Sequence, residues 1–97
     1  MRKLPDGVIK LMHIIAEDWN VEESKLLGDA SKERLRIILR IAADLDALFR
    51  EENVIRKWLD TPVNNEGNVS NKELILSNDP YDLEKVAYWV SFISGRR

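Results

Sequence analysis

The sequence lacks cysteine at all 97 positions, and it contains a single histidine. The absence of cysteine excludes disulfide bonds, thiol catalysis and thiolate metal sites, and it suits a reducing compartment. The single histidine, His13, lies at helical spacing from Lys10 and Glu17, which predicts an exposed side chain near Glu17. Metal binding would need more ligands than the chain presents at helical spacing, so we expect no metal ion.

An excess of charge and long apolar runs are also missing. The net charge is −2 at pH 7, so no strong field attracts nucleic acid or an anionic membrane. No stretch approaches the ~18 apolar residues that a membrane span needs. Pro5, Asp6 and Lys10 interrupt the apolar segment that a signal peptide would need. These absences favour a cytoplasmic protein.

The residue patterns of common catalytic sites do not occur either. There is no glycine-rich phosphate loop, and paired carboxylates such as Asp44 and Asp46 have no accompanying nucleophile. We therefore expect neither catalytic residues nor a cofactor, and the chain is not expected to be an enzyme. Binding another protein is the function class that these exclusions leave.

Helical spacing of apolar residues is present along almost the whole chain, whereas no long alternation indicates a strand. It predicts an all-α domain of five or six helices around a long central helix, spanning 1–97. The expected helices cover about 7–19, a short stretch after Asn20, 32–49, 51–60, a short stretch after Ser70, and a last helix after Pro80 that ends near Gly95. The expected N-caps are Asn20 (with Glu23), Ser31, Ser70 (with Glu73 as a capping box) and Asp79, and Gly28 is expected to end the second helix.

Apolar residues cover about half the circumference of the first and central helices. The predicted core face of the first helix consists of Val8, Leu11, Met12, Ile15 and Trp19. The predicted core face of the central helix consists of Leu35, Ile38, Leu39, Ala42, Leu45 and Phe49, with a second apolar strip at Ile37, Ile41 and Leu48. Surfaces this wide predict that the protein forms a homodimer.

Asp46 falls in the middle of the predicted core face of the central helix. An unpaired buried carboxylate costs several kcal/mol, so a partner is expected. That partner would be an arginine or a helix N-terminus within the domain, or a polar group across a subunit or partner interface. The sequence leaves both open.

The last helix has two apolar sides. Its predicted core face carries Leu83, Val86, Val90 and Ile93, and the opposite side carries Tyr81, Tyr88 and Phe92. Aromatic residues are enriched at interface hot spots, so the second side is a candidate binding surface. Coverage by the first helix or by a neighbouring copy is the alternative. Arg96 and Arg97 follow as a solvated tail or as groups that enter a partner's pocket.

The segment from Arg36 to Gly95 carries a series of motifs in a fixed order. They fall on Leu45, Leu48-Phe49, Trp58-Leu59, Pro62, Gly67, Ser70, Leu74-Ile75, Val86 and Gly95, and Trp19-Asn20-Val21 and Leu26-Leu27-Gly28 precede them. In this order they resemble the C-terminal toxin-binding domain of Xre/MbcA/ParS-type antitoxins. Val63 and Asn71 depart from the family pattern, and the segment after Gly28 is too short for the DNA-reading helix that the family usually has. By this resemblance 1–34 is a helix-turn-helix remnant and 35–97 is the toxin-binding part.

The resemblance implies an antitoxin whose partner is a RES-domain toxin that attacks NAD. The antitoxin would neutralise this toxin by occluding its active site. The residues expected to bind the partner are Tyr81, Tyr88, Phe92, Gly95, Arg96 and Arg97. The alternative is a DNA-binding transcriptional regulator or autoregulator, against which the acidic balance and the short segment after Gly28 argue.

Overall fold

The computed structural model describes residues 6–62, 69–77, 79–93 and 95. In this part of the chain there are six helices and no strand, which confirms the predicted all-α class. The helices are α1 (Asp6–Trp19), α2 (Glu23–Leu27), α3 (Lys32–Phe49), α4 (Glu52–Asp60), α5 (Asn71–Leu76) and α6 (Pro80–Ile93). None of these helices is long and apolar enough to cross a membrane.

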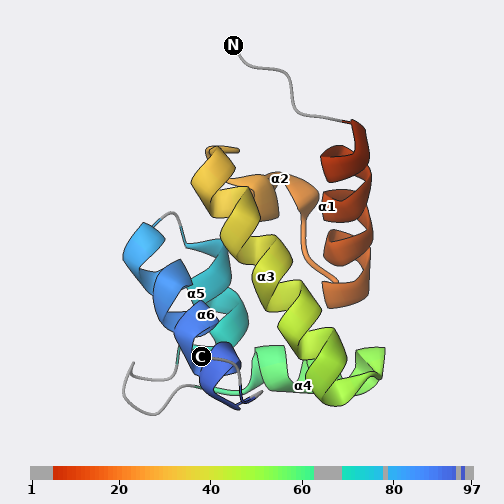
Figure 1. Ribbon diagram of the computed structural model, residues 1–97, viewed down its shortest axis with the longest axis vertical. Helices are drawn as coiled ribbons and strands as arrows, with labels where there is room; N and C mark the ends of the chain where they lie inside the picture. Colours follow the sequence, from red (N-terminus) through yellow and green to blue (C-terminus); the bar gives the residue numbers. More distant parts are fainter. Residues whose placement is uncertain (1–5, 63–68, 78, 94, 96–97) are drawn as a thin grey trace.

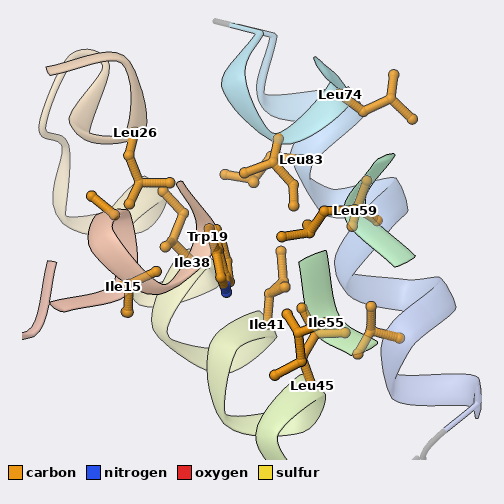
Figure 2. Close-up of a cluster of buried hydrophobic side chains, with 14 of the residues drawn as sticks. Ile15, Trp19, Leu26, Ile38, Ile41, Leu45, Ile55, Leu59, Leu74 and Leu83 are labelled. Atoms are coloured by element: carbon orange, nitrogen blue, oxygen red, sulfur yellow. The ribbon is translucent and has the colours of Figure 1, made fainter. Parts of the chain in front are cut away.

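The long helix α3 runs through the middle of the bundle, as predicted from its wide apolar arc (Figure 1). α1 lies on one side of it, α5 and α6 lie on the other, and α4 passes across its C-terminal end. The core is built from side chains that converge from all these elements, among them Trp19, Leu26, Ile41, Leu59 and Leu83 (Figure 2). Burial of each large apolar side chain contributes about 1.5–3 kcal/mol.

The core face of α3 is rotated relative to the prediction. Ile38, Ile41 and Leu45 are fully buried, whereas Leu39 and Ala42 are only partly buried. As a consequence Asp46 is exposed, and the prediction that it is buried was wrong. The buried carboxylate is that of Asp44, whose exposed fraction is 1%.

Two more residues predicted to lie in the core are on the surface. Leu11 of α1 is 48% exposed, and Ala16 is buried near the other edge of that helix face. Ile93 is also exposed, because it belongs to the last turn of α6, beyond the buried Val90. The prediction failed at these positions because the apolar arc of each helix is wider than the area that contacts the core. The sequence alone does not show which part of the arc is buried.

Most helix boundaries follow the predicted caps. Ser31 Oγ accepts a hydrogen bond from Arg34 N, and Ser70 with Glu73 forms the complete capping box. Asp79 Oδ1 accepts from Tyr81 N at 2.9 Å, in front of Pro80. Each of these caps satisfies a backbone N–H that the first turn of a helix leaves without an intrahelical partner.

Asn20 does not cap α2, in contrast to the prediction. Its φ of +57° is left-handed and its N–H donates to Glu17 O at 3.1 Å, so Asn20 terminates α1. The last carbonyls of α1 are further satisfied by Arg56, whose Nε donates to Asp18 O at 2.7 Å. The N-cap position of α2 is occupied by Glu22, which makes no side-chain capping bond.

Candidate protein-binding groove between α3 and α6

Helices α3 and α6 lie side by side and run in the same direction (Figure 1). Ser31 and Pro80 line one hollow at their N-terminal ends. Nine residues further along α3, Arg40 Nη2 donates a hydrogen bond to Ser91 Oγ of α6 at 3.2 Å. The two helices therefore stay in register along most of their length, and their outer faces form a continuous surface.

An open groove of about 880 Å³ runs between these outer faces. The α3 wall is formed by Glu33, Arg36, Ile37 and Arg40. The α6 wall is formed by Glu84, Ala87, Tyr88, Ser91 and Phe92. A smaller hollow of about 280 Å³ extends the groove toward the N-terminal ends of both helices, because it shares Glu33, Ile37 and Glu84 with the larger one.

Tyr88 and Phe92 form an aromatic pair on the α6 wall. They are one turn apart, their ring centroids are 6.4 Å apart, and their planes are inclined by 27°. The exposed fractions are 68% for Tyr88 and 73% for Phe92. Large aromatic side chains exposed next to a groove are typical of anchors in protein interfaces.

Tyr81, the third aromatic residue predicted for this surface, is exposed but lies outside the groove lining. The ammonium group of Lys85 lies 5.0 Å from its ring centroid and 6.0 Å from that of Trp89, a geometry that suits cation–π contacts. The structure therefore brings Tyr88 and Phe92 together and leaves Tyr81 apart. The predicted stripe consists of two separate parts.

Gly95 lies three residues after Phe92, the second member of this aromatic pair. Its N–H donates to Phe92 O at 3.2 Å and its φ is +84°. A Cβ at this position would meet no atom within 4 Å, so only the left-handed backbone favours glycine here. Arg96 and Arg97 lie outside the described residues.

Two arginines of the groove, Arg36 and Arg40, were missed by the sequence reasoning. They lie four residues apart on α3, with Ile37 between them in the groove wall. Within the described part of the chain neither takes part in an ion pair with a carboxylate. Their i, i+4 spacing was visible in the sequence, but the packing of α6 beside them was not.

The charges of the groove are segregated. Asp29, Glu33 and Glu84 outnumber the buried Arg34 at its N-terminal end, and Arg36 and Arg40 follow toward the end where Phe92 lies. The groove is thus acidic at one end, and basic with exposed aromatic rings at the other. Such a surface can bind a chain that has both apolar and charged side chains.

A third arginine of α3 holds the helices that support the groove. The Arg34 side chain is buried, and its Nε donates to Leu26 O at 3.0 Å while Nη2 donates to Lys25 O at 3.2 Å. Nη2 and Nη1 also donate to Ile75 O at 3.0 Å and to Ser77 O at 3.3 Å. One guanidinium therefore satisfies carbonyls at the C-terminal ends of both α2 and α5, where cations are also favoured by the helix dipoles.

Burial affects the pKa of Arg34, and the Arg34 side chain restricts which residue fits at position 28. Burial lowers the pKa of Arg34, and the nearby Asp29 carboxylate opposes this effect. Gly28 has a φ of +55°, and a Cβ added there would lie 2.5 Å from Arg34 Nε. Glycine is required here for both reasons, so Gly28 and Arg34 act as one unit.

His13 lies on α1, and its side chain is exposed, as predicted. Its Nε2 is 3.7 Å from Glu17 Oε2, and its Nδ1 forms a 2.9 Å hydrogen bond with Glu23 Oε1. The hydrogen bond to Glu23, followed by the charges of Glu17 and Glu23, raises the pKa of His13 above its ordinary value. No group of three or more potential metal ligands lies together among the described residues.

Comparison of the chain with protein families, with curated proteins and with solved structures finds no match in any of the three. The motifs that resemble the antitoxin family include Leu45, Leu59, Leu74, Ile75 and Val86, all of which are buried. These residues build the core, so they bear on the fold more directly than on the partner. The surface residues of the groove are what bear on binding.

Proposed function

We propose that this chain is a protein-binding module that acts as an antitoxin and holds its toxin in the groove between α3 and α6. The observation that carries the proposal is the exposed aromatic pair, Tyr88 and Phe92, beside Arg36 and Arg40. Tyrosine and arginine are among the residues that most often supply binding energy at protein interfaces. Burying this pair would remove two large apolar surfaces from water.

The identity of the partner comes from the resemblance to Xre/MbcA/ParS-type antitoxins. It makes the partner a RES-domain toxin that attacks NAD, and neutralisation takes place by occlusion of the toxin's active site. Gly95 donates its N–H to the carbonyl of Phe92, which lines the basic, aromatic end of the groove. Gly95, Arg96 and Arg97 are accordingly proposed as the segment that covers the active site.

A DNA-binding regulator is the rival function. Such a protein needs a helix that presents several basic side chains to the phosphates. Arg36 and Arg40 are accompanied by Glu33, Glu84 and Asp29 along the same groove, and these carboxylates would repel a polyanion. The charge pattern favours a protein partner. Homodimerisation stays a prediction, supported by the exposed Leu11 and Ile14 of α1.

Co-expression with the product of the gene beside this one, which the proposal expects to be a RES-domain protein, tests the proposal. The double variant Tyr88→Ala/Phe92→Ala should lower the affinity at least ~30-fold, the equivalent of one hot-spot anchor of about 2 kcal/mol, because the costs of neighbouring anchors are not additive. Val54→Ala is the matched control, since Val54 is 38% exposed on α4, outside the groove. Binding is measured by titration calorimetry on the purified proteins.

Two outcomes would contradict the proposal. If the parent chain does not bind the RES-domain protein, the antitoxin assignment is wrong. If the double variant binds as tightly as the Val54→Ala control, the groove is not the binding surface.

A further inference from the structure

The groove between α3 and α6 has a polarity that restricts what can fill it. Asp29, Glu33 and Glu84 lie at the N-terminal end, and Arg36 and Arg40 lie nearer to Phe92. Ile37, Ala87 and Tyr88 also line the groove and add apolar surface to it. A bound segment must therefore carry apolar side chains along one face and charges of opposite sign at its two ends.

We propose that the groove binds an amphipathic helix of the partner whose carboxylates lie over Arg36 and Arg40 and whose basic side chains lie over Glu33 and Glu84. This inference rests on the proposed protein-binding function and specifies the chemistry of the partner segment. Helix-in-groove recognition places residues i, i+4 and i+7 of one face against an apolar groove. Tyr88, Phe92 and Ile37 supply the apolar surface for such a face.

The length of the groove agrees with this occupant. Ser31 and Arg40, which mark its two ends on α3, are nine residues apart, which corresponds to roughly 14 Å of helix axis. A partner helix of three turns covers this distance. Its acidic and basic residues then fall about two turns apart, since Glu33 and Arg40 on α3 are separated by seven residues.

Arg36 and Arg40 can bind carboxylates of a partner, whereas Arg34 cannot. The guanidinium of Arg34 donates hydrogen bonds to four backbone carbonyls within the domain. Arg36 and Arg40 form no ion pair within the described residues, and only the Arg40–Ser91 hydrogen bond occupies a donor. A guanidinium has five N–H donors, and carboxylates match its fork geometry.

A polyanion such as nucleic acid fits this groove poorly. Phosphates follow one another along the whole length of a nucleic acid, so some of them would lie against Asp29, Glu33 and Glu84. A peptide can carry a carboxylate at one end and an ammonium group at the other. The segregated charges thus favour a protein segment.

The test uses two synthetic helical peptides of three to four turns with the same composition. Both carry leucine at i, i+4 and i+7. In the segregated peptide the glutamates and the lysines flank the leucine face in separate groups about two turns apart, whereas in the interleaved peptide Glu and Lys alternate at i, i+4 spacing. Interleaved charges stabilise the free helix through i, i+4 pairs, and segregated charges stabilise it through the helix dipole, so circular dichroism of both free peptides measures their helicity and the affinities are compared at equal helicity. Fluorescence anisotropy with the full chain measures both affinities.

We expect the segregated peptide to bind at least five-fold more tightly, and the difference to shrink at high salt. The variant Arg36→Glu/Arg40→Glu should abolish this preference, and Arg36→Ala/Arg40→Ala gives the same readout if charge reversal disturbs the fold. Equal binding of the two peptides, or no binding of either, would overturn the inference. Because the peptides do not depend on the toxin, a failure here leaves the co-expression result to decide the proposed function separately.

Discussion

Arg34 and the pair Arg36 and Arg40 are close neighbours on one helix, yet they occupy opposite environments. Arg34 is 7% exposed and donates hydrogen bonds to carbonyls of α2, of α5 and of Ser77. Arg36 and Arg40 are exposed and line a groove. An arginine whose N–H donors are bonded to carbonyls inside the domain stabilises the fold. An arginine on the surface whose donors lack such partners within the domain can bind a carboxylate of another molecule.

Arg34→Met should produce the largest loss of stability. Methionine retains much of the apolar contact but removes every donor, so buried carbonyls at the ends of α2 and α5 lose their partners. We expect a loss of ~3–5 kcal/mol in the free energy of unfolding, measured by urea denaturation. Arg34→Lys should recover only part of it, because an ammonium group lacks the planar fork. A Met variant as stable as the parent would show that these hydrogen bonds contribute little.

Gly28→Ala should have the next largest effect. The left-handed φ disfavours alanine, and the added Cβ would lie 2.5 Å from Arg34 Nε, so the guanidinium must shift. We expect a loss of ~2–3 kcal/mol by thermal and urea unfolding. In the Arg34→Met background the cost should be smaller, and a double-mutant cycle measures that coupling. Strictly additive effects would contradict the view that the two residues act as one unit.

Local signals allowed much of the fold to be predicted. The capping box at Ser70 and Glu73 and the Asp79–Pro80 start of α6 depend on residues within three positions of each other, and the structure confirms both. The burial of Asp44 instead of Asp46 was not predictable in this way. The apolar arc of α3 covers about half its circumference, so the neighbouring helices decide which part faces the core.

The candidate site was predictable only in part, for a related reason. Tyr88 and Phe92 were found because aromatic residues opposite a core face are visible in the sequence. Arg36 and Arg40 were missed, since their role appears only once α6 lies beside α3. Arg34 was also missed, because its partner carbonyls at Lys25 and Ile75 are 9 and 41 residues away in the chain.

The smallest effect on stability should come from Arg36→Ala and Arg40→Ala. Their free energies of unfolding are compared with that of Arg34→Met. Neither guanidinium is buried, so Arg36→Ala should change the free energy of unfolding by less than about 0.5 kcal/mol. Arg40→Ala should cost at most about 1.5 kcal/mol, because it also loses the part-buried hydrogen bond to Ser91. Both variants should nevertheless weaken binding of the segregated peptide, measured on the same protein samples by anisotropy. If Arg36→Ala destabilised the chain as strongly as Arg34→Met, the groove arginines would be structural. If both variants keep most of their stability but bind the segregated peptide more weakly, Arg36 and Arg40 belong to the binding surface and not to the core.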